Sequence, residues 1–101
     1  MAEKSFAEKV YQVTKQIPRG KVASYRDIAH QLQCKAYRAV GSALNKNPHA
    51  PIVPCHRVVN SDGNLGGFAS GLKKKIKMLR KEGVIIEKNK INLVNFGHKW
   101  S

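Results

Sequence analysis

The sequence predicts a mainly α-helical domain with a small β element, organised around a winged-helix-like helix-turn-helix. Apolar residues recur at helical spacing in several short segments, and capping residues stand at the starts of two of them. Two of these segments also follow each other across a short connection, as in a helix-turn-helix. A chain of 101 residues can bury one modest core, so residues 1–101 are expected to form a single domain.

A first helix is expected to start at Ser5, because Ser5 and Glu8 have the spacing of a capping box. The sequence Pro18-Arg19-Gly20 should end it. Between these points one face carries apolar residues at helical spacing: Phe6, Val10, Val13 and Ile17. Such a stripe is typical of core positions, and no chemistry is assigned to it.

The helix-turn-helix is expected next. Ser24 should cap its first helix, with Asp27 in the capping-box position. The second helix is predicted over residues 36–45, and Ala29 is small enough to let the two helices cross closely. Many helical hairpins bind no ligand, so this motif alone is weak evidence for DNA binding.

A last long helix follows a glycine-rich loop. Gly83 should end this helix, and its buried stripe should consist of Leu72, Ile76 and Leu79. The rest of its surface is expected to be solvated because it is densely basic: Lys73, Lys74, Lys75, Lys77, Arg80 and Lys81. Residues 84–86 and 90–93 then suggest a small hairpin or wing, with Phe96 and Trp100 packing back onto the domain.

The net charge points to a polyanionic partner. Nineteen Lys and Arg against six Asp and Glu leave a formal charge of +13, and each phosphate that such a protein neutralises releases condensed counterions. Nucleic acid is therefore expected ahead of an anionic membrane surface. No apolar run is long enough to span a bilayer, and the polar residues 1–5 do not resemble a signal peptide.

Cysteine usage indicates a reducing compartment. Cys34 and Cys55 stand in unrelated contexts, so they form neither a disulfide framework nor a metal clip. His49, Cys55 and His56 also lack the spacing of a structural zinc site. A cytoplasmic monomer with reduced thiols and no metal or organic cofactor is expected.

The most distinctive stretch is residues 51–59, which read Pro-Ile-Val-Pro-Cys-His-Arg-Val-Val and precede a glycine-rich run. His56 is the kind of side chain that can take a proton from the thiol of Cys55 and make it a nucleophile. In an extended segment, adjacent side chains point to opposite faces, so a bridging water or a turn at Pro54 would be needed. For an arbitrary Cys-His pair, a buried structural cysteine beside a surface histidine is the commoner explanation.

The hexapeptide Pro54-Cys55-His56-Arg57-Val58-Val59 resembles the active-site signature of the O6-alkylguanine-DNA alkyltransferases, which move an alkyl group from a DNA base to their own cysteine. The resemblance covers about residues 6–83. Its further matches are Ser24-Tyr25, Arg38-Ala39-Val40-Gly41, Asn47-Pro48 and Glu82-Gly83. It implies a catalytic domain that repairs O6-alkylguanine in double-stranded DNA in a single turnover, without a cofactor.

The resemblance also implies catalytic roles. Glu82 would orient His56, and His56 would accept the thiol proton of Cys55 through water. The hydroxyl of Tyr25 would help to rotate the phosphate and donate to the base. Asn47 would tie the DNA-binding helix to the active-site loop. From the residues alone, Tyr25 could be a packing aromatic and Asn47 an ordinary helix terminator.

The resemblance further implies that the helix over residues 36–45 lies in the minor groove. Arg38 would enter the base stack and fill the space of the extruded nucleotide, although a phosphate contact or a solvated charge is the simpler explanation. The small residues around it suit a close approach of the backbone to DNA: Ala39, Gly41 and Ser42. The walls of the alkyl pocket would come from Val58, Phe68 and Ala69.

Two other functions remain open. Familiar alkyltransferases carry an additional N-terminal domain, which is expected to be absent because this chain begins almost directly at the catalytic one. That length resembles the alkyltransferase-like proteins, which bind alkylated DNA without repairing it and typically replace the cysteine. The intact Cys55, His56 and Glu82 favour an enzyme over such a sensor. The second alternative is a basic helix-turn-helix regulator with an inert cysteine.

Overall fold

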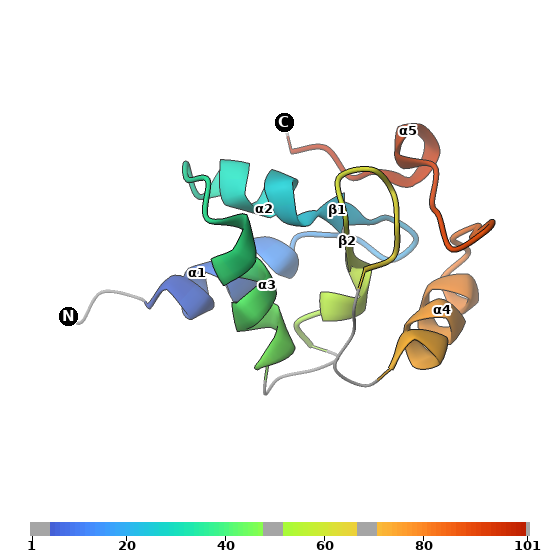
Figure 1. Cartoon of the computed structure of the whole chain (residues 1–101), viewed down its shortest axis with the longest axis horizontal. Coiled ribbons are helices and arrows are strands. Elements are labelled where there is room, and N and C mark those ends of the chain that lie inside the picture. The colour runs from blue at the N-terminus through green and yellow to red at the C-terminus, as the bar shows by residue number, and fades with distance from the viewer. Residues whose placement is uncertain (1–4, 48–51, 67–70, 101) are drawn as a thin grey trace.

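The computed structural model describes residues 5–47, 52–66 and 71–100, and its elements follow one another as Figure 1 shows. In chain order they are α1 (Phe6–Thr14), β1 (Ala23–Ser24), α2 (Tyr25–Gln31), α3 (Tyr37–Asn45), the 3-10 turn η1 (Cys55–Arg57), β2 (Val58–Val59), α4 (Leu72–Lys81) and α5 (Leu93–Phe96). The predicted mainly helical class with a small β element is confirmed. None of the helices in these ranges has the length and apolar character needed to cross a bilayer.

The β element is a pair of two-residue strands, distant in sequence. β1 and β2 run parallel, with Ala23 opposite Val58 and Ser24 opposite Val59. The prediction had instead placed a hairpin after the last helix. There the structure has only an isolated antiparallel bridge between Glu87 and Lys90, in addition to one between Asn64 and Lys90. Strands of two residues have no readable periodicity, so tertiary pairing alone reveals them.

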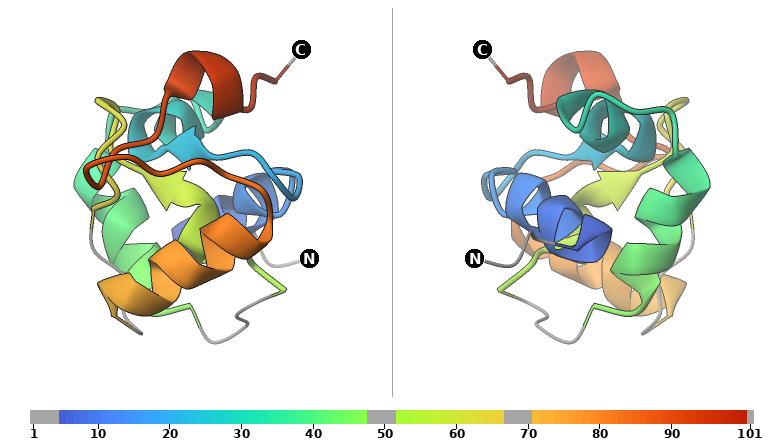
Figure 2. Two further views of the ribbon diagram at one scale, coloured as in Figure 1. Left: turned by 90° about the vertical axis from the view of Figure 1, so that its right-hand side faces the viewer. Right: turned by 90° about the vertical axis from the view of Figure 1, so that its left-hand side faces the viewer.

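This short sheet separates two cores, because neighbouring residues on a strand point to opposite faces. Ala23 and Val58 belong to one core, formed with α1, α2 and α3 by Val10, Val13, Ile17, Ile28, Ala29, Val40, Ala43, Leu44 and Val53. Val22 and Val59 belong to the other, which lies under α4 with Leu65, Leu79, Val84, Ile86 and Ile91. In both views of Figure 2, α5 lies at the top and α4 towards the bottom, and Figure 1 shows the two helices at the same end of the long axis.

The capping predictions hold for α2. Asp27 N donates to Ser24 Oγ at 3.0 Å, and Ser24 N donates to Asp27 Oδ2 at 3.1 Å, which is the reciprocal capping box. α3 begins within a residue of its predicted start and ends at the predicted residue, Asn45. Together α2 and α3 form the helix-turn-helix that the sequence predicted.

The first helix starts at its predicted cap, where Ser5 Oγ accepts from Glu8 N at 3.2 Å, but it ends earlier than predicted and its first residue is less buried than predicted. α1 stops at Thr14, whose hydroxyl donates to the carbonyl of Val10 at 2.7 Å, and the chain continues in tighter turns. Ile17 is nevertheless 1% exposed, because these turns direct it into the core. Phe6, which was predicted to be a core residue, is 38% exposed, because it belongs to the first turn, at the end of the apolar stripe.

Candidate active site and DNA interface

Cys55 begins a turn and is not part of an extended strand. Cys55 N donates to Val53 O at 2.8 Å, and Arg57 N donates to Pro54 O at 2.9 Å, so the chain folds tightly from Pro54 onward. Successive side chains of a 3-10 turn point about 120° apart. Cys55 and His56 therefore do not point to opposite faces, as they would in an extended segment. Cys55 is half-buried at the edge of the first core and is not in a disulfide.

His56 is paired with Glu82, as the resemblance implied. Its Nε2 lies 3.1 Å from Glu82 Oε2, and the histidine is 2% exposed. Because a carboxylate only accepts hydrogen bonds, Nε2 carries the hydrogen in this pair. Nδ1 is then the ring atom that can accept a proton.

Glu82 is fixed by the end of α4. Gly83 N donates to Arg80 O, and Val84 N donates to Leu79 O, both at 3.0 Å, which is a Schellman motif with Glu82 as the C-cap. Gly83 takes φ +92°, which favours glycine. The predicted helix end is confirmed. Glu82 stands at the negative end of the α4 dipole, where a carboxylate is slightly unfavourable. Its hydrogen bonds to His56 and Arg57 explain why an acidic residue occupies this position.

Arg57 is a site residue to which the sequence reasoning gave no role. Its Nε and Nη2 donate to the two oxygens of Glu82 at 2.9 and 2.7 Å, and its Nη1 donates to the carbonyl of Ile17 at 2.9 Å. The Arg57 and Glu82 side chains are only 16% and 11% exposed. A charged residue inside an otherwise apolar motif was the available signal, because such a charge needs a buried partner.

Electrostatics keep His56 neutral. Burial lowers its pKa below the usual 6.5; the charges of Arg57 and Lys75 act in the same direction, and the hydrogen bond and charge of Glu82 only partly oppose them. Burial alone would raise the pKa of Glu82. The hydrogen bonds from Arg57 and His56 outweigh that effect and hold this pKa below 4.5. At neutral pH the pair is therefore a neutral imidazole on an ionised carboxylate.

Lys75 is fully buried, so its predicted place on a solvated face is wrong. Its Nζ donates to the carbonyls of Val58, at 2.7 Å, and Leu65. Burial lowers its pKa to about 8, and the negative charge of an ionised Cys55 acts in the opposite direction. The sequence does carry the signal, because Lys75 stands four residues before the buried Leu79, on the inner face of α4. Leu72, which was predicted to belong to the buried stripe, is 39% exposed, because it is the first residue of the helix.

Tyr25 opens α2 beside the cysteine. Burial raises the pKa of its hydroxyl above 10.0, and the charge of an ionised Cys55 adds to the effect. The phenol therefore remains a hydrogen-bond donor at neutral pH. Gly41 of α3 faces this ring, since a Cβ at that position would lie in van der Waals contact with Tyr25 Cε1, at 3.8 Å.

Asn47 connects the helix-turn-helix to the active-site segment. Its Nδ2 donates to the carbonyl of Val53 at 3.0 Å, two residues before Cys55. The contact has the form that the resemblance implied. It shows that one amide side chain can hold the end of α3 against the turn that carries the thiol.

Three of the five predicted DNA-binding residues, Tyr25, Arg38 and Gly41, line one hollow of about 430 Å³, which we call the recognition hollow. It is lined by Tyr25, Arg26, Tyr37, Arg38, Gly41, Asn60, Ser61 and Asp62. Ala39 and Ser42 are exposed on α3 close to it in sequence. The guanidinium of Arg26 lies 5.6 Å from the centre of the Tyr37 ring. Tyr25 is therefore close to both features: its side chain lines the recognition hollow, and a negative charge on Cys55 would raise its pKa.

The predicted pocket walls are only partly described. Val58 is fully buried in the first core, and its carbonyl accepts from Lys75, so the structure gives it a packing role. Its place in a substrate pocket stays a prediction. Phe68 and Ala69 lie outside the described residues. Within the described ranges, no group of three or more His, Cys, Asp or Glu side chains is arranged to hold a metal ion.

Comparison with known proteins gives a consistent family. The DNA-binding domain of 6-O-methylguanine DNA methyltransferase matches residues 5–84. The methylated-DNA-protein-cysteine methyltransferase of Methanosarcina mazei is 49% identical over 78 residues, which cover 76% of this chain and 49% of that protein. That of Sulfolobus acidocaldarius is 46% identical over 83 residues, which cover 82% and 52%. The chain therefore spans about half the length of these curated relatives.

Among the solved structures, one matches over about half of its own length and another over almost all of it. The O6-methylguanine-DNA methyltransferase of Pyrococcus kodakaraensis aligns with a TM-score of 0.72 and 45% identity, over 80% of this chain and 47% of that chain. S. pombe Atl1, solved in complex with damaged DNA containing O6-carboxymethylguanine, aligns with a TM-score of 0.85 and 33% identity. The Atl1 match covers 98% of this chain and 99% of that chain.

Proposed function

Because the chain belongs to the 6-O-methylguanine DNA methyltransferase family, we propose that it repairs O6-alkylguanine in double-stranded DNA by transferring the alkyl group to Cys55. The observation that carries this proposal is the pairing of His56 with Glu82 at 3.1 Å, on the same turn as the half-buried thiol. A neutral imidazole beside a cysteine is the arrangement that activates a sulfur nucleophile.

The transfer would proceed by one displacement. His56 Nδ1 takes the thiol proton through a water molecule, and the imidazolium is stabilised by Glu82. The Cys55 thiolate attacks the alkyl carbon, an S–C bond forms, and the bond between that carbon and guanine O6 breaks. The electron pair stays on the guanine, as an anion that Tyr25 can hydrogen-bond. A thioether does not revert to a thiol easily, so each chain would act once.

Access to the alkyl carbon would require the nucleotide to leave the base stack. Small residues on α3 would let its backbone approach the minor groove closely, and Arg38 would occupy the space left behind. Both Tyr25 and Arg38 line the recognition hollow, which supports a shared role in handling one extruded nucleotide. Extrusion costs a few kcal/mol, which the stacked guanidinium and phosphate contacts would offset.

Arg57 and Asn47 would act as positioning residues. Arg57 holds both oxygens of Glu82, so the carboxylate presents a fixed edge to His56. Asn47 holds the segment before Cys55 to the end of α3. A movement of the DNA-binding helix α3 would therefore shift the segment that carries Cys55.

A lesion sensor without transfer activity is the second candidate. The observation that favours it is the match to S. pombe Atl1 over almost the whole of both chains. Cys55 favours transfer, because the alkyltransferase-like proteins typically replace that cysteine. The structure supports transfer further through the intact His56–Glu82 pair.

The mass of the intact protein separates these functions. We expect incubation with a duplex containing O6-methylguanine to add the mass of a single methylene per chain, and Cys55→Ala to add nothing. Selective binding of the damaged duplex without a mass change would support the sensor instead. Equal binding of damaged and undamaged duplexes, again without a mass change, would point to a regulator. An undamaged duplex of the same sequence is the control.

A further inference from the structure

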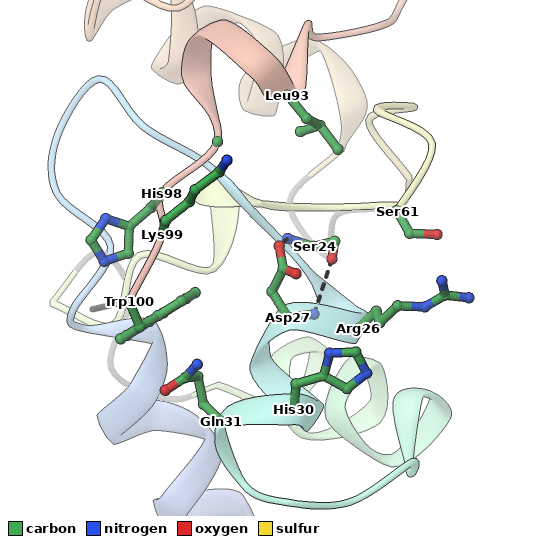
Figure 3. A pocket seen from close by; sticks show the side chains of 11 residues that line it. Ser24, Arg26, Asp27, His30, Gln31, Ser61, Leu93, His98, Lys99 and Trp100 are labelled. Carbon is green, nitrogen blue, oxygen red and sulfur yellow. Dashed lines mark hydrogen bonds between the residues drawn. The ribbon is translucent and has the colours of Figure 1, made fainter.

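A second hollow, of about 530 Å³, lies between α2 and residues 93–100; we call it the tail hollow (Figure 3). One wall comes from α2, through Arg26 and His30, and the other from the chain end, through His98, Lys99 and Trp100. The family match stops at residue 84, so the second wall lies beyond it. The proposed transfer chemistry uses none of these side chains.

The wall formed by the chain end is a fixed part of the fold. Val22 N donates to Phe96 O at 2.8 Å, and His98 N donates to Val22 O at 2.7 Å, so this segment is bonded to the residue before β1. Trp100 Nε1 donates to Gln16 Oε1 at 2.6 Å, and the Trp100 ring packs edge-on against His98 with centroids 4.6 Å apart. The hollow therefore has two walls that are both anchored to the core.

The charged side chains around the tail hollow suit an anionic group that belongs to a larger molecule. Arg26 and Lys99 stand on opposite sides of the hollow, and the imidazole of His30 lies at its edge (Figure 3). The carboxylate in the hollow is Asp27, which already accepts the backbone N–H of Ser24. Arg26 and Lys99 are exposed and can reach a phosphate without unfolding any part of the site.

The tail hollow adjoins the recognition hollow. Arg26 and Ser61 line both of them, so the two hollows share one wall. A DNA strand whose damaged nucleotide lies near Tyr25 and Arg38 would pass Arg26 and meet the tail hollow next. We propose that the tail hollow binds a phosphodiester of the DNA backbone adjacent to the lesion, through Lys99 and Arg26. This rests on the proposed function only in taking DNA as the partner.

Salt dependence of DNA binding tests the contact. A single phosphate contact changes the slope of log K against log salt by about 0.9, so affinity should fall about threefold further between about 50 and about 200 mM salt when that contact is present. We expect wild type to show this extra threefold loss relative to Lys99→Gln, measured by fluorescence anisotropy with an undamaged duplex. Lys9→Gln removes the same charge from exposed Lys9 on α1, which lines neither hollow, and should follow wild type. Identical salt slopes for Lys99→Gln and Lys9→Gln would overturn the proposal.

Neutral backbone substitutions locate the contact. Among single methylphosphonates placed along a duplex, one beside the lesion should weaken binding by wild type without weakening binding by Lys99→Gln further. Equal losses in both proteins at every position would overturn the proposal. Transfer from a free benzylated guanine should be unchanged in Lys99→Gln. If wild type gained no methyl group from the duplex containing O6-methylguanine, the proposed function would be refuted, whereas failure of the binding tests alone would refute only the phosphate contact in the tail hollow.

Discussion

The burial of the Lys75 ammonium should make the free energy of unfolding depend on pH. Its pKa is about 8 in the folded protein against 10.5 ordinarily, and this difference corresponds to about 3 kcal/mol at about 1.4 kcal/mol per pKa unit. A lysine with a lowered pKa binds fewer protons when folded than when unfolded, between these two values. The free energy of unfolding should therefore rise with pH across that window, and the penalty should be fully present below pH 8.

The expected effect is measurable over a moderate pH range. Between about pH 7 and about pH 9.5 the linkage relation gives about 2 kcal/mol of added stability from Lys75 alone. We expect urea unfolding followed by circular dichroism to show this increase in wild type and to show about 2 kcal/mol less of it in Lys75→Met. Lys75→Met also loses the hydrogen bonds to Val58 and Leu65, but that loss does not depend on pH.

A matched variant isolates the buried group. Lys74→Met removes an exposed lysine from the same helix and should keep the pH dependence of wild type. Parallel stability curves for wild type and Lys75→Met would refute the reasoning, because Lys75 would then have an ordinary pKa in the folded state. If Lys75→Met is too unstable to study, wild type and Lys74→Met each test the reasoning by themselves, because without a buried titrating lysine neither would gain about 2 kcal/mol across this window.

Three further outcomes follow from the site. Arg38→Ala should slow repair of duplex DNA by at least about tenfold while leaving transfer from a free benzylated guanine unchanged, because only the duplex requires extrusion; equal losses would remove its assigned role. His56→Gln should lower the rate of thiol alkylation by about a hundredfold or more at unchanged DNA affinity, as expected for loss of a general base, and an unchanged rate would exclude the relay. Ser24→Ala should reduce the free energy of unfolding by about 1 kcal/mol, measured by urea unfolding, because it removes the cap of α2; no loss would mean that the cap contributes nothing.

Local signals in the sequence predicted the helical part of the fold well. The α2 cap depends on Ser24 and Asp27 alone, and the end of α4 depends on Gly83 and its immediate neighbours. Such features are decided within a few residues, so a sequence displays them directly. The pairing of β1 with β2 joins positions more than thirty residues apart through two residues each, and no local pattern reveals it.

The site shows the same division. Cys55, His56 and Glu82 were identified through a resemblance, and the His56–Glu82 distance agrees with it. Lys75 was missed because it was judged by its charge, which usually indicates solvent, and Arg57 was given no role. Lys75 is fully buried and the Arg57 side chain is 16% exposed, and their donors are directed at a carboxylate or at backbone carbonyls. A positively charged residue inside an apolar motif, or at an inner position of a helix, therefore indicates a hydrogen-bond partner inside the protein more often than its charge alone would suggest.

The most direct test of the account is the identity of the residue that carries the alkyl group. After reaction with a duplex containing O6-methylguanine, the protein would be digested and its two cysteine peptides compared by mass spectrometry. We expect the added methyl on the Cys55 peptide alone, with the Cys34 peptide unchanged as an internal control. A methyl on Cys34, or on neither cysteine while the lesion remains in the DNA, would contradict the claim that Cys55 is the acceptor.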